Sequence, residues 1–107
     1  MKLLKKFNEY NINENVSNLA SDIFKKITDI YNSVGAKNYE NIEDYFNVEN
    51  YYHIFKNYSI KELSDFKNSL MELSSDYYVE YFLNYLIENL MENDIISEDD
   101  AEFLSEN

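Results

Sequence analysis

Apolar side chains recur every three to four residues along almost the whole chain, and this spacing predicts an all-α protein. The longest unbroken run of the pattern predicts a helix over residues 16–34, with Asn15 as its N-cap and Gly35 as a left-handed residue at its C-terminal end. A shorter amphipathic stretch, from Lys2 to about residue 11, predicts a separate first helix.

The middle of the chain contains two helical stretches that polar residues delimit. Residues 39–58 keep the helical spacing with an interruption near Asn47, so one helix or two short ones fit. Ser59 followed by Glu62 has the form of a capping box, in which each side chain bonds to the backbone N–H of the other. This box predicts a helix over residues 60–73.

The last third of the chain predicts a strongly apolar helix from Asp76 to Glu92, and Ser97 with Asp100 forms a weaker box ahead of a short terminal helix. The chain has 107 residues, one glycine and no proline, and no linker or repeat divides it. We therefore expect a single helical domain, residues 1–107, folded as a compact bundle of five or six short to medium helices.

Charge restricts the possible partners. The formal net charge is −12, from 21 acids against nine lysines. Residues 1–37 hold six lysines and four acids, a net of +2, and residues 38–107 hold three lysines and seventeen acids, a net of −14. Direct binding to nucleic acid or to an anionic membrane needs a basic surface, so both are disfavoured. We expect a cytoplasmic protein, because no export signal or membrane-length apolar run is visible.

The residue types that most catalytic sites need are scarce. The chain lacks cysteine, and His53 is its one histidine, expected to be a partly buried, hydrogen-bonded side chain on a helix. One glycine cannot build a phosphate-binding loop, and adjacent acids such as Asp99 and Asp100 diverge around a helix. We expect no catalytic, cofactor-binding or metal-binding site.

A candidate binding surface follows the helix predicted from Asp76 to Glu92. One broad arc of this helix is apolar and must face the core. The opposite arc carries acids and tyrosines at four-residue intervals, and Glu72 would extend the row if the serines that follow do not redirect the chain. We call this surface the acid and tyrosine face, and its residues are Glu72, Asp76, Tyr77, Glu80, Tyr81, Tyr85, Glu88 and Glu92.

Two interpretations of this face compete. Tyrosines are frequent at binding hot spots and carboxylates select basic partners, which favours an interface. Alternatively, the acids are a solvated stripe, and the tyrosines are rim residues with buried rings and exposed hydroxyls.

A second cluster of acids follows the face in sequence. It comprises Asp94, Glu98, Asp99, Asp100 and Glu102. Acids are also favoured at a helix N-terminus by the helix dipole, which is the simpler explanation for three of them in a row.

Mimicry of a nucleic acid needs more than one helix. Carboxylates four residues apart rise about 6 Å per step, whereas each strand of duplex DNA carries a charge about every 3.4 Å. Acids of a neighbouring helix would have to contribute, and the candidates are Glu40, Glu43, Asp44 and Glu49.

In size and charge, and in no sequence motif, the chain resembles phage anti-CRISPR and anti-restriction proteins, which are small acidic inhibitors. The resemblance implies an inhibitor without enzymatic activity. Its partner would be a basic protein, such as a nuclease or other nucleic-acid-binding enzyme, whose nucleic-acid site it occupies. An immunity protein against a basic toxin would use the same complementarity. A helical adaptor that associates with itself through exposed tyrosines is a third possibility, and the pattern leaves the oligomeric state open.

Overall fold

The computed structural model describes the backbone of residues 2–106 and the side chains of residues 15–106. Five α-helices and two 3₁₀ turns, with no strand, make up this part of the chain, so the all-α prediction is confirmed. The elements, in chain order, are α1 (Lys2–Tyr39), η1 (Ile42–Asp44), η2 (Val48–Tyr51), α2 (Tyr52–Phe55), α3 (Ile60–Leu73), α4 (Tyr77–Glu92) and α5 (Glu98–Glu106).

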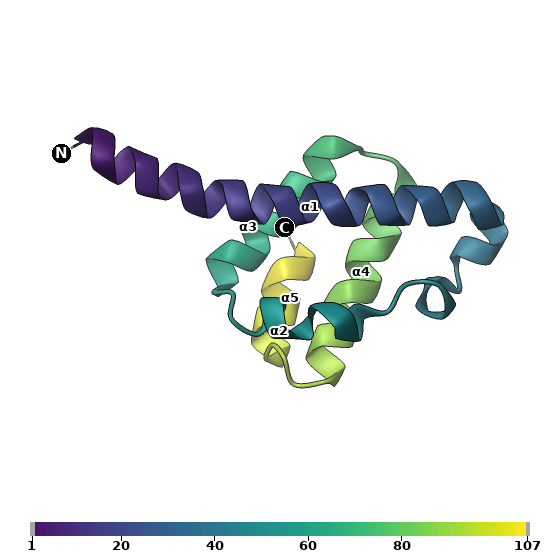
Figure 1. The fold of residues 1–107 in the computed structure, drawn as a ribbon. Coiled ribbons are helices and arrows are strands. Elements are labelled where there is room, and N and C mark those ends of the chain that lie inside the picture. The colour runs from purple at the N-terminus through teal and green to yellow at the C-terminus, as the bar shows by residue number, and fades with distance from the viewer. Residues whose placement is uncertain (1, 107) are drawn as a thin grey trace.

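The long helix α1 lies across the other elements (Figure 1). It packs chiefly against α3 and then α4, while α5 lies against α4 and α3. The separate first helix predicted from Lys2 is wrong, because α1 runs through this region without a break. Asn15 lies inside the helix and cannot be its N-cap. Asparagine is tolerated at an exposed position in a helix interior, so a residue typical of caps does not by itself start a helix.

Gly35 interrupts α1 as its position predicted. Its φ of 83° and ψ of 164° are non-helical, and they lie in a region that only glycine occupies at low cost. The last turn of α1, up to Tyr39, therefore leaves the axis of the main helix. This bend brings Tyr39 into the core, where its side chain is fully buried and its hydroxyl donates to the carbonyl of Tyr78 at 2.9 Å.

Local capping signals set the ends of the later elements. Asn47 ends the first part of the predicted 39–58 stretch, and its side chain accepts a hydrogen bond from the backbone N–H of Glu49. Ser59 and Glu62 form the predicted capping box, with both reciprocal bonds in place at 3.1 and 2.9 Å. At the start of α5, Ser97 accepts a hydrogen bond from the N–H of Asp100.

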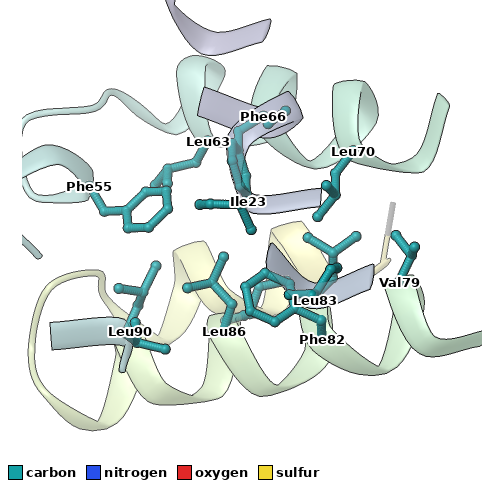
Figure 2. Close-up of a cluster of buried hydrophobic side chains, with 14 of the residues drawn as sticks. Ile23, Phe55, Leu63, Phe66, Leu70, Val79, Phe82, Leu83, Leu86 and Leu90 are labelled. Atoms are coloured by element: carbon teal, nitrogen blue, oxygen red, sulfur yellow. The ribbon is translucent and has the colours of Figure 1, made fainter. Parts of the chain in front are cut away.

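One hydrophobic core joins the helices (Figure 2). Ile23 comes from α1, Phe55 from α2, Phe66 from α3 and Phe82 from α4, and each is 1% exposed or less. The arc of α4 predicted to face inward is buried throughout, from Val79 to Leu90. Among residues 2–106, no helix combines the length and apolar character that a membrane span requires.

Candidate protein-binding surface

Two adjoining grooves lie along α4, and carboxylates border both of them. The first groove, of about 340 Å³, lies between α4 and the segment that runs from Glu40 into η1. The second, of about 440 Å³, lies between α4 and α5. They share Asn84 and Glu88, so together they form one surface across three parts of the chain. We call this surface the acidic double groove.

Acids far apart in the sequence meet at the acidic double groove. Glu40 and Glu43 line the first groove, Glu88 lies between the two grooves, and Glu98 and Glu102 line the second. All five side chains are exposed. The acidic surface therefore extends beyond one helix, as nucleic-acid mimicry requires. Of the neighbouring acids named as candidates, Glu40 and Glu43 line a groove, whereas Asp44 and Glu49 line neither.

Two tyrosines of α4 attach the end of α1 and so place Glu40 beside the groove. The hydroxyl of Tyr81 donates to the backbone carbonyl of Glu40 at 2.7 Å, and that of Tyr77 donates to the carbonyl of Ala36 at 3.4 Å. The ring of Tyr77 also meets Tyr31 edge-on, with centroids 6.0 Å apart. Both hydroxyls are thus hydrogen-bonded within the chain, and the two tyrosines hold the end of α1 against α4.

Tyr85 lines the first groove together with Glu43. Burial raises the pKa of its hydroxyl, and the negative charge of Glu43 raises it further. The hydroxyl therefore remains protonated across the physiological range and stays available as a hydrogen-bond donor beside the carboxylates.

No lysine lines either groove among the described side chains. Lys67 is 9% exposed, and its ammonium donates to the backbone carbonyl of Leu104 at the end of α5. Burial lowers the pKa of Lys67, and Glu80 opposes this effect. Lys61 pairs with Asp65 at 3.3 Å on α3. The surface around Glu88, Glu98 and Glu102 thus keeps its negative charge.

Several predicted interface residues lie away from the acidic double groove. Glu72 lies on α3 in a separate depression with Asp65 and Asn68, because the chain is extended at Ser74 and turns between α3 and α4. The condition on which Glu72 would extend the row, that the serines do not redirect the chain, is therefore not met. The other outliers are exposed or half-buried residues that line neither groove, and they are Asp76, Tyr77, Glu80, Glu92, Asp94, Asp99 and Asp100.

Asp94 has a conformational role at the end of α4. Its φ is +60°, and it occupies the left-handed position of a Schellman motif. The N–H of Ile95 donates to the carbonyl of Leu90 at 2.9 Å, and the N–H of Asp94 donates to that of Met91 at 3.1 Å. An acid here also lies at the negative end of the helix dipole.

Replacing Asp94 by glycine is expected to stabilise the protein by about 1 kcal/mol, because glycine adopts positive φ without strain and carries no charge. Asp94→Asn should give part of the gain, since asparagine tolerates this conformation and removes only the charge. Urea unfolding would measure both. Asp99→Gly, in the regular helix α5, is the control and should destabilise. An unchanged or lower stability for Asp94→Gly would contradict this reading of the C-terminal cap.

His53 differs from its prediction. Its side chain is exposed, whereas a partly buried position was expected. In the short helix α2, Phe55 takes the buried position, and its neighbours Tyr52 and Ile54 are only partly covered. Among side chains 15–106, no group of three histidine, aspartate or glutamate residues is placed to hold a metal ion.

Comparisons with protein-family models, with curated protein sequences and with solved structures found no match for this chain.

Proposed function

We propose that this protein is an inhibitor that binds the basic nucleic-acid site of a nuclease or other nucleic-acid-processing enzyme and excludes the nucleic acid. The observation that carries the proposal is the acidic double groove. Carboxylates from three separate segments border one surface, and no lysine among the described residues lines it.

Charge density supports this proposal over a simple solvated helix. A single row on α4 places acids about 6 Å apart, which is sparse beside the phosphates of a duplex strand at about 3.4 Å. Glu40 and Glu43 add charge on one side of Glu88, and Glu98 and Glu102 add it on the other. A basic cleft would therefore contact carboxylates from three segments and not from a single row. Long-range electrostatic attraction would also speed the association of the two proteins.

The grooves also provide the apolar contact that a charged surface lacks. The half-buried ring of Tyr85 lies in the first groove, and the half-buried side chain of Met91 lies in the second. Apolar contact holds a complex after electrostatic attraction has brought the partners together, because exposed ion pairs alone contribute little affinity.

The experiment is affinity capture with the tagged chain in a bacterial lysate, followed by elution with a salt gradient and identification of the captured proteins. We expect one basic nucleic-acid enzyme to elute at a defined salt step. Duplex DNA or RNA should displace it at lower concentration than polyglutamate of equal charge. A cleavage assay on the recovered enzyme should show inhibition by the free chain.

A captured partner that binds no nucleic acid, or equal displacement by polyglutamate, would refute the proposal. An immunity protein against a basic toxin would use the same grooves, so the two functions differ in the partner. Protection of cells against one cognate toxin, with no effect on other nucleases, would identify the immunity function.

A further inference from the structure

The first groove of the acidic double groove combines aromatic rings with acids. Tyr81 and Tyr85 line it, and both side chains are half-buried, so part of each remains accessible. Glu40, Glu43 and Glu88 border the same space. A cation that binds here contacts aromatic rings as well as carboxylates, and a solvated stripe of acids offers carboxylates alone.

Contacts with buried aromatic residues fix both tyrosine rings. Tyr81 contacts the ring of Tyr39, with centroids 6.0 Å apart, and its hydroxyl donates to the carbonyl of Glu40 at 2.7 Å. Tyr85 contacts the ring of Phe82, with centroids 6.4 Å apart. Side chains that are already held in place lose little conformational freedom when a ligand binds, so the cost of binding at this groove is low.

Tyr85 lies close to two carboxylates that come from different elements. Glu88 follows it by three residues on α4, so the two side chains are neighbours on the helix surface. Glu43 belongs to η1, and its negative charge raises the pKa of the Tyr85 hydroxyl, as expected of a nearby carboxylate. A cation stacked on the ring of Tyr85 would therefore have two carboxylates within reach.

The polar side chains around Tyr85 make no bonds elsewhere in the chain. Among side chains 15–106, no hydrogen bond or ion pair within the protein involves the side chain of Glu43, Asn84, Tyr85 or Glu88. Their carboxylate, amide and hydroxyl oxygens are therefore available to accept hydrogen bonds from a partner.

We infer that the first groove binds an arginine side chain of the inhibited enzyme, one that otherwise holds a phosphate group of the nucleic acid. A guanidinium group is planar, stacks on aromatic rings and donates several N–H groups in a fixed fork, so it can contact a ring and carboxylates together. A lysine ammonium is a compact, strongly hydrated charge and fits such a site less well. The inference rests on the proposed function, because it names the residue type through which the enzyme is recognised.

The size of the groove agrees with a single anchoring side chain. Its volume of about 340 Å³ is at the lower end of the range of about 300–1,000 Å³ found for small-ligand sites. Arginine and tyrosine are also the residue types that most often dominate the binding energy of protein interfaces. One buried arginine on two tyrosines is thus a sufficient centre for the contact.

Nuclear magnetic resonance of the purified chain tests the preference for arginine without any enzyme. The probes are N-acetyl-arginine methylamide and N-acetyl-lysine methylamide, which carry the same charge, titrated in low salt. We expect the arginine compound to shift the side-chain amide signals of Asn84 and the ring signals of Tyr85. Its dissociation constant should be about two- to fivefold lower than that of the lysine compound, because an exposed cation–π contact contributes about this factor.

Variants of Tyr85 separate the contribution of the ring from that of the hydroxyl. Tyr85→Leu removes the ring and should abolish the preference for arginine, whereas Tyr85→Phe should keep it. Tyr45→Leu is the matched control, because Tyr45 is 50% exposed and lines a different depression, with Lys26 and Asn50. This control should leave the preference unchanged.

Variants of the exposed acids test the carboxylates without changing the packing. Glu43→Gln with Glu88→Gln should weaken the binding of both probes. The control, Glu49→Gln with Glu72→Gln, removes the same charge at exposed positions outside the groove and should have little effect.

Equal dissociation constants for the two probes would overturn the inference. So would a lack of saturable binding, or shifts at Glu49 and Glu72 as large as those at Glu88. An inhibited enzyme together with no preference for arginine would mean that the proposed function holds and this inference is wrong. A preference for arginine without capture of any nucleic-acid enzyme would support the arginine site and contradict the proposed function.

Discussion

Reversing four acids of the acidic double groove is expected to weaken binding to the captured enzyme by about a hundredfold or more. The variant carries Glu43→Lys, Glu88→Lys, Glu98→Lys and Glu102→Lys. These substitutions replace negative charge by positive charge in both grooves. Lysines would then face the basic residues of the partner, and repulsion would replace attraction. Inhibition titrations and association rates at two salt concentrations would measure the loss, which should diminish as salt is raised.

A second variant with the same change in net charge is the control. It reverses acids that line neither groove, and these are Asp22, Glu49, Glu72 and Glu106. Circular dichroism should show both variants folded, since all eight side chains are exposed. If the two variants lost inhibition equally, net charge and not the acidic double groove would be responsible, and the proposed site would be wrong.

Truncating Phe82 to alanine should lower the free energy of unfolding by about 3–5 kcal/mol. Its ring is fully buried at the centre of the bundle (Figure 2). It meets Phe46 edge-on, with centroids 5.0 Å apart and planes at 73°. The substitution removes this contact and leaves a cavity that the surrounding helices fill only in part. Because small domains are stable by about 5–15 kcal/mol in total, the variant should be near the limit of folding.

Thermal and urea unfolding would measure this effect, with a melting temperature lowered by about 15 °C or more. Phe103→Ala makes the same chemical change on α5, where the ring is 49% exposed. It should cost far less, because less surface is transferred back to water. Equal losses for the two variants would mean that Phe82 does not pack as the structure has it.

Only part of the candidate surface could be predicted from the pattern of residues. Glu88, Glu98 and Glu102 were in the predicted interface and line the acidic double groove, and so do Tyr81 and Tyr85. Glu72 was added to the same row on the condition that Ser74 and Ser75 do not redirect the chain. The extended backbone at Ser74 breaks the register, and a wheel projection cannot detect such a break.

The role of the charge on Lys67 could not be predicted from the sequence either. Counting residues makes it one of three cations in the acidic two-thirds of the chain. The fold buries it under the end of α5, where it bonds to the carbonyl of Leu104, 37 residues away. Its charge is therefore used inside the molecule. The spacing of apolar neighbours offered no sign of this, because the partner is a backbone atom of a distant segment.

The amino-acid sequence alone determined the helical class, the start of α3 at Ser59, the interruption at Gly35 and the buried arc of α4. These features depend on contacts within about one helical turn, and residue type and spacing specify such contacts directly. Only the tertiary structure decided that Glu40 and Glu43 border the same surface as Glu88. The hydrogen bond from the hydroxyl of Tyr81 to the carbonyl of Glu40 joins residues that are 41 positions apart in the sequence. A contact between such distant residues depends on how the helices pack.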